Sequence, residues 1–242
     1  MTDERPAFYS LTPGGWRDYW SLLHPPYTVW HLSYVVIGAS LAAEVQVRWL
    51  LETLLAFFLA MGLAAHALDE LNGRPLRTRI PDAVLWTIAV VGLGGAVALG
   101  IDGAREVSPW LWAFIAAGVF FVLAYNLELF GGVVHSDLWF ALAWGAFPVL
   151  TAAFAQTAEV RLEAVAAAAA CAAISAGQRV LSTPVRRLRR SVASVEGALV
   201  TNHGDREPLD ASALRAAPEG ALRWLSFAMP LLAGAMLLSR LD

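Results

Sequence analysis

A short group of ionisable residues ends an apolar stretch early in the chain. His66, Asp69 and Glu70 follow residues 49–65, which are nearly all Leu, Ala, Phe, Met and Trp. A helix through this stretch carries the group to its end, where charged side chains are costly to bury without partners. Spacings of three and four place the imidazole and the carboxylates on one helix face. Such a face can bind a divalent metal ion; the alternative is a helix end solvated by lipid headgroups.

Three arginines follow this group. Asn72-Gly73 predicts a left-handed end to the helix, and Pro75 prevents the helix from resuming. Arg74 and Arg77 come next and can neutralise an anionic substrate. The alternative, which we favour for Arg77 and Arg79, is that these side chains anchor the loop at the cytoplasmic membrane surface.

A second polar group joins the fourth and fifth apolar segments. It comprises Tyr125, Asn126, Glu128, His135 and Asp137. Gly131-Gly132 predicts a break between these residues, so helical periodicity does not decide whether they converge. Ser136 or Asp137 is expected to cap the following helix, whereas Glu128 has no such structural role.

The composition is that of a polytopic membrane protein. Hydrophobic residues make up 58% of the 242 residues and charged residues 15%, and the mean hydropathy is +0.57. The chain has no lysine, which excludes Schiff-base chemistry, and its single cysteine, Cys171, excludes an intrachain disulfide. A net charge of -3 without a basic tail gives no reason to expect a nucleic-acid partner.

Seven apolar segments are each close to the length that a bilayer requires. They cover residues 29–47, 49–68, 84–101, 109–127, 138–156, 160–181 and 221–239. The predicted fold is therefore an all-α membrane bundle of about seven transmembrane helices. Its parts are an N-terminal cytoplasmic or interfacial segment (1–28), a six-helix membrane core (29–181), a cytoplasmic amphipathic helix and loop (182–219) and a last transmembrane helix (220–242).

Arginine placement predicts the orientation in the inner (plasma) membrane. The N-terminal segment and the even-numbered connections together hold 13 arginines, against four on the other side, which predicts a cytoplasmic N-terminus and an external C-terminus. Polar residues then gather at the cytoplasmic helix ends: His24, His31, His66, Asp69, Glu70, Asn126, Glu128, His135, Asp137, Gln178 and Arg179. A shared cytoplasm-facing cavity is the simplest explanation.

An amphipathic helix is expected over residues 182–200. A run of arginines lies on one side of this helix. On the other side, apolar residues recur at helical spacing, at Val185, Leu188, Val192, Val195 and Leu199. Docking on anionic lipid is favoured over binding a phosphorylated substrate. Residues 201–219 are predicted to form a mobile loop.

The order of these motifs resembles the UbiA superfamily of intramembrane prenyltransferases. Gly73-Arg74-Pro75 and Arg79-Ile80-Pro81 are similar to the sequence that follows the family's first Asp-rich motif. Tyr125, Thr183-Pro184-Val185 and His24-Pro25 resemble three further motifs, so the likeness covers about residues 24–190. It implies a membrane lipid or isoprenoid substrate and a prenyl transfer in which Mg²⁺ holds a diphosphate, with His66 and Glu70 at positions where the family has aspartates.

The sequence departs from the family in its second half. Residues 171–182 contain no carboxylate, so the second Asp-rich motif is absent. After this point the sequence also predicts fewer helices than the family usually has. Histidines also shift the metal preference from Mg²⁺ toward Zn or Fe, because Mg²⁺ favours hard oxygen ligands.

Three hypotheses remain. The first is a divergent prenyl or lipid transferase, with catalytic residues Asp69, Glu70 and Tyr125 and substrate-binding residues Arg74, Arg77, Asn126, Gln178 and Arg179. The second is an iron or zinc metalloenzyme acting on a lipid or quinone. The expected metal ligands, for Mg²⁺ in the first case and Fe or Zn in the second, are His66, Glu70, Glu128, His135 and Asp137. The third is a lipid-binding or transport protein whose polar cavity performs no chemistry.

Overall fold

Helices form at all seven of the predicted apolar segments. The computed structural model describes residues 5–240; residues 1–4 and 241–242, at the outer ends of the predicted segments 1–28 and 220–242, lie outside it. The α-helices are α1 (Trp16–Leu22), α2 (Pro25–Ala39), α3 (Val47–Phe57), α4 (His66–Leu71), α5 (Asp82–Glu106), α6 (Leu111–Asn126), α7 (Asp137–Phe140), α8 (Phe147–Thr157), α9 (Leu162–Arg190) and α10 (Ala211–Leu238). The chain is thus the all-α membrane helix bundle that its composition predicts.

Within the described residues, five helices are long and apolar enough to cross a membrane. They are Val47–Leu71, Asp82–Glu106, Asp137–Thr157, Leu162–Arg190 and Ala211–Leu238. Two of them contain π-helical segments, η1 (Phe58–Ala65) between α3 and α4 and η3 (Ala141–Ala146) between α7 and α8. The apolar helix α6 is shorter, and α2 has 15 residues.

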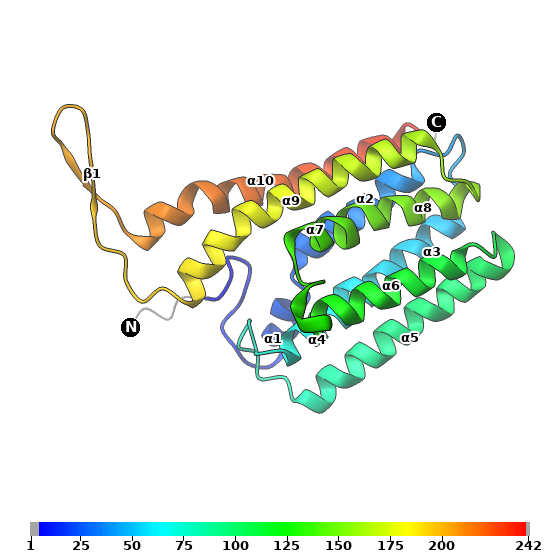
Figure 1. Ribbon diagram of the computed structural model, residues 1–242, viewed down its shortest axis with the longest axis horizontal. Coiled ribbons are helices and arrows are strands. Elements are labelled where there is room, and N and C mark those ends of the chain that lie inside the picture. Colours follow the sequence, from blue (N-terminus) through cyan, green and yellow to red (C-terminus); the bar gives the residue numbers. More distant parts are fainter. Residues whose placement is uncertain (1–4, 241–242) are drawn as a thin grey trace.

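The helices pack as two groups. In one, α2 contacts α8 and α10, and α9 contacts η3 and α10. Its core contains Trp30, Tyr34, Val149 and Leu222. In the other, α5 packs against α3, η1, α4 and α6. Figure 1 shows α9 beside α10 along one edge of the bundle, and α5 along the opposite edge.

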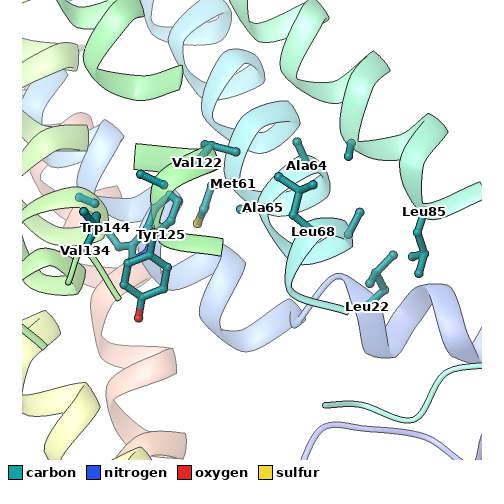
Figure 2. Close-up of a cluster of buried hydrophobic side chains, with 14 of the residues drawn as sticks. Leu22, Met61, Ala64, Ala65, Leu68, Leu85, Val122, Tyr125, Val134 and Trp144 are labelled. Atoms are coloured by element: carbon teal, nitrogen blue, oxygen red, sulfur yellow. The ribbon is translucent and has the colours of Figure 1, made fainter. Parts of the chain in front are cut away.

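The second group has its own apolar core beside the predicted site. Figure 2 shows Leu22, Leu68 and Leu85 on one side of this core, and Tyr125 with Trp144 on the other. The Tyr125 hydroxyl points out of the cluster. The core therefore fixes the end of α4 and the end of α6, which carry the two predicted polar groups.

The predicted helix boundaries in residues 182–219 differ from the structure. The helix expected over 182–200 is the end of α9 as far as Arg190; beyond it, β1 (Ala198–Val200) pairs antiparallel with β2 (Arg206–Pro208). The helix α9, which ends at Arg190, packs on α10. Leu199 and Val200 in the hairpin are exposed, so a helix there would have no buried apolar face. Helix α10 begins at Ala211, within the predicted loop, because the Asp210 side chain caps it by accepting a hydrogen bond from Ala213 N (2.7 Å).

Small residues let the helices of the bundle approach closely. Gly145 in η3 faces α9, where an added Cβ would lie 2.7 Å from the Cys171 carbonyl oxygen and 2.8 Å from the Ala172 Cα. The backbone of α9 would have to move, because such contacts are closer than van der Waals packing permits.

We expect Gly145→Ala to destabilise the protein by about 1–3 kcal/mol, because overpacking forces α9 away from η3. The midpoint of thermal unfolding in detergent should fall accordingly. Gly94→Ala is the matched control, since no heavy atom lies within 4 Å of a Cβ at Gly94 in α5. Equal midpoints for the two variants would contradict this packing.

Candidate functional site

A cavity of about 490 Å³ lies among α2, α4, the end of α6 and α9, and residues 6–9 of the N-terminal segment also line it. Nine of the eleven polar residues expected at the cytoplasmic helix ends line it: His24, His31, His66, Asp69, Asn126, Glu128, His135, Gln178 and Arg179. Glu128 and His135 therefore reach the same cavity as His66 across the break at Gly131-Gly132, where both glycines have positive φ.

The basic wall of the cavity comes mainly from α9. Arg186, Arg187 and Arg190 line it together with Arg179, whereas its acidic residues are Asp69 and Glu128. Sequence reasoning assigned this run of arginines to lipid docking and missed their position at the cavity. The signal was present in the spacing, because residues 179, 186 and 190 are separated by seven and four and so share one helix face.

The histidines are held in pairs with aromatic or imidazole rings. The rings of His24 and His66 stack with centroids 4.1 Å apart, and His135 stacks on Tyr125 at 4.4 Å. His66 Nδ1 lies 3.1 Å from the Gly62 carbonyl oxygen, and His135 Nδ1 lies 3.0 Å from that of Tyr125. Because a carbonyl oxygen only accepts, Nδ1 is the donor in both, and Nε2 is left as the basic nitrogen of the neutral ring.

The N-terminal segment contributes two groups whose charge states are fixed by burial. Burial, reinforced by His66 and by Arg190 and Arg186, lowers the pKa of His24 well below its usual value. Burial and the neighbouring Tyr27 raise the pKa of the Tyr9 phenol well above its usual value. At neutral pH the cavity thus receives a neutral imidazole from His24 and a hydrogen-bond donor from Tyr9.

Glu70 has a structural position and does not line the cavity. Its side chain is fully buried; one carboxylate oxygen accepts from Leu76 N (2.9 Å), and the other from Thr78 N (2.8 Å) and Thr78 Oγ1 (2.9 Å). Its neighbour Asp69 faces the cavity instead. The expectation that Glu70 is a catalytic residue and a metal ligand therefore disagrees with its geometry.

Arg74 and Arg77 also lie outside the cavity lining. Arg74 donates to the Ile80 carbonyl oxygen (2.6 Å) and forms an ion pair with Asp82, which closes the loop before α5. Arg77 is exposed on a backbone with φ 57°. The contacts of Arg74 give it a structural role in the loop, and both arginines lie apart from the cavity where substrate binding was expected.

Asp137 is exposed and pairs with Arg179 across 2.8 Å. Its neighbour Ser136 is the N-cap of α7 and accepts a hydrogen bond from Trp139 N (3.5 Å). Of the five predicted metal ligands, His66, Glu128 and His135 remain at the cavity.

The described side chains do not form a metal site. In the part of the chain that the structure describes, no group of three or more His, Cys, Asp or Glu side chains is placed to hold a metal ion. Catalytic zinc takes three protein ligands, and two Mg²⁺ ions on a diphosphate require several oxygen ligands. The donor set therefore fits neither arrangement.

Comparison with known proteins gives one relevant likeness. The chain is similar to protoheme IX farnesyltransferase of Alkalilimnicola ehrlichii, with 30% identity over 138 residues, which cover 49% of this chain and 45% of that relative. The chain thus spans less than half the length of the curated relative it matches. Because that relative is a member of the UbiA superfamily, the match supports the resemblance at superfamily level. No protein-family model and no solved structure matches the chain.

The contrast between Glu70 and Asp69 can be tested by thermal unfolding. We expect Glu70→Gln to destabilise the protein by about 2–4 kcal/mol, because an amide nitrogen would face backbone N–H groups that need an acceptor. Asp69→Asn should change the stability by less than about 1 kcal/mol, since this side chain lies at the cavity. Equal losses from the two substitutions would contradict the structural assignment of Glu70.

The buried His24 predicts an acid-dependent loss of stability. Below about pH 6.5 the unfolded chain binds a proton at His24 that the folded protein does not, so the free energy of unfolding falls as the pH falls, by at most about 1.4 kcal/mol per unit. His24→Asn, which tolerates the positive φ of 46°, should flatten the dependence of the unfolding midpoint between pH 7 and 5. His203→Asn in the exposed hairpin should leave it unchanged; a similar effect of both would contradict the prediction.

Proposed function

We propose that the protein is a membrane transferase that moves a prenyl or related lipid group from a diphosphate ester to an acceptor. The observation that carries this proposal is that the arginine-lined cavity and an apolar groove are neighbours that share two lining residues. A groove of about 110 Å³ runs between the helix Val47–Leu71, α5, α6 and the helix Asp137–Thr157, and Met61 and Trp144 line both it and the cavity.

The two spaces together suit an amphipathic ligand. The lining of the groove is almost wholly aliphatic and aromatic, as in Leu93, Phe114 and Phe147. It favours a hydrocarbon group through dispersion and the hydrophobic effect, and its volume suits a short segment of a hydrocarbon chain. The cavity beyond Met61 and Trp144 presents cationic and hydrogen-bonding side chains for a charged head. A ligand of this shape places the bond between its tail and its head at the junction.

Prenyl transfer at that junction needs few protein groups. The C–O bond to the diphosphate breaks and its electron pair leaves with the diphosphate, while the prenyl carbon bonds to a nucleophile of the acceptor, which gives up a proton. The arginines of α9 neutralise the leaving group. The Tyr125 ring stabilises positive charge on the prenyl carbon, Asp69 accepts the acceptor's proton, and Asn126 and Gln178 orient the substrate.

The proposed orientation follows the arginine distribution. The arginines of the cavity belong to the arginine-rich side of the chain, so the positive-inside rule places the cavity at the cytoplasmic face. The two ends of the described chain lie at opposite ends of the bundle (Figure 1). At the cavity end of α9, Arg190 donates to the Pro6 carbonyl oxygen. At the other end of the bundle, Arg240 donates to the carbonyl oxygen of Ser40, just after α2. This arrangement suits a cytoplasmic N-terminus and an external C-terminus.

The proposal is tested with radiolabelled farnesyl diphosphate and protein in lipid nanodiscs, with a membrane lipid extract as the source of acceptor. We expect label to enter a diphosphate-free lipid product, and Asp69→Asn to reduce the rate by about 10²-fold or more, the usual scale for general acid–base catalysis. Leu142→Ala on η3, outside both linings, should leave the rate unchanged. Binding without product would support a lipid-binding protein, and no binding would overturn the proposal.

A further inference from the structure

One face of α9 presents a row of polar side chains to the cavity. Arg179, Thr183, Arg186 and Arg190 all line it, and their spacings of four, three and four keep them on one helix face. The row extends about 16 Å along the axis. It begins in residues 171–182, where the second acidic motif of the resembled family is missing, and continues beyond them to Arg190.

The arginines of α9 differ in what they contact. Arg189, on another face, forms a bidentate ion pair with Glu219 of α10 (2.5 and 2.9 Å). Arg179 pairs with Asp137 at 2.8 Å and lies over the Phe140 ring, 5.2 Å from its centroid. These contacts hold α9 against its neighbours.

Among the described residues, Arg186 and Arg190 form hydrogen bonds only to neutral groups. Arg186 donates to Thr183 Oγ1 (3.3 Å), and Arg190 to the Pro6 carbonyl oxygen (3.3 Å). Within residues 5–240 neither forms an ion pair with a carboxylate. Because a guanidinium group has five N–H donors, most of the donors of both side chains are available to a ligand.

The carboxylates at the cavity are fewer than its arginines. Among the described residues Asp69 and Glu128 line it against four arginines, and Asp69 interacts electrostatically with both Arg186 and Arg190. Glu70 is committed to the loop and Asp137 to Arg179. The described residues of the cavity therefore include too few carboxylates to hold a pair of Mg²⁺ ions. They also include more guanidinium groups than carboxylates. Such a combination favours an anionic ligand bound directly.

We infer that Arg186 and Arg190 bind the diphosphate of the lipid substrate directly, through charge-assisted hydrogen bonds, without a bridging metal ion. This inference rests on the proposed function and specifies how its substrate is recognised. Arg179 is a positioning residue, because its ion pair with Asp137 fixes the opposite end of the row. The guanidinium groups supply the positive charge that Mg²⁺ supplies in a metal-dependent site.

The test is calorimetric binding of farnesyl diphosphate to the full chain in phosphatidylcholine nanodiscs, with excess EDTA or with Mg²⁺. We expect the dissociation constants in the two buffers to agree within about threefold. Arg186→Gln and Arg190→Gln should each weaken binding by about tenfold or more, the loss of one charge-assisted interaction. Arg206→Gln in the exposed hairpin is the control and should bind as the wild type does, and thermal unfolding verifies that all three variants fold.

The possible failures are distinguishable. If wild-type protein binds farnesyl diphosphate in Mg²⁺ and loses it in EDTA, the inference is overturned and the proposed function survives. If wild-type protein binds in neither buffer, the proposed function fails with it. Normal binding by folded Arg186→Gln and Arg190→Gln also overturns the inference.

A membrane phospholipid presents similar phosphate chemistry, so a further arm replaces part of the phosphatidylcholine with phosphatidylglycerol. Farnesyl diphosphate should still bind with at most a few-fold loss. If phosphatidylglycerol abolishes its binding, and native mass spectrometry shows that the arginine variants no longer retain phosphatidylglycerol, the arginines form a headgroup site and the inference is overturned.

Discussion

The carboxylate of Glu70 organises the cavity end of this protein. A fully buried charged group must have its acceptor sites filled, and the backbone of residues 76–78 fills them. The loop thus folds back onto the end of α4 and passes close to α1, where Asp18 accepts from Arg79 N (3.1 Å) and Gly14 N (2.9 Å). The N-terminal segment is in this way tied to the same loop, and it brings Phe8 and Tyr9 over the cavity.

Close helix packing fixes the other walls. Where Gly92 and Gly145 face neighbouring backbone, α5 approaches η1 and α9 approaches η3, and close approach of this kind is a main source of association between helices in lipid. Both contacts involve a π-helical segment, and such segments occur often at functional sites because they rotate the residues that follow. Here η1 leads directly into His66, and η3 contains Trp144 at the junction of cavity and groove. The groove and the arginine row therefore belong to one packed unit.

The distribution of charge decides which chemistry the site can support. A metal centre requires several carboxylates or histidines that converge within bonding distance, and the described residues do not provide one. Guanidinium groups on a helix can stabilise the same anion with no metal, because charge-assisted hydrogen bonds are strong where water is scarce. The chain can therefore resemble a farnesyltransferase in part and still lack an acidic motif on α9, because the arginines can take the place of the metal ions that such a motif binds.

The sequence alone determined the class of fold, the apolar segments, the helix end at Asn72-Gly73 and the gathering of polar residues at one end, because these depend on composition, length and local backbone preferences. The tertiary structure decided which side chains face the cavity. Adjacent residues on a helix point about 100° apart, so only packing against α1 and the loop distinguishes Glu70, which turns away, from Asp69, which faces inward. The same holds for Arg186, because the periodicity of α9 places it on a face but only the positions of α2, α4 and the N-terminal segment make that face the wall of a cavity.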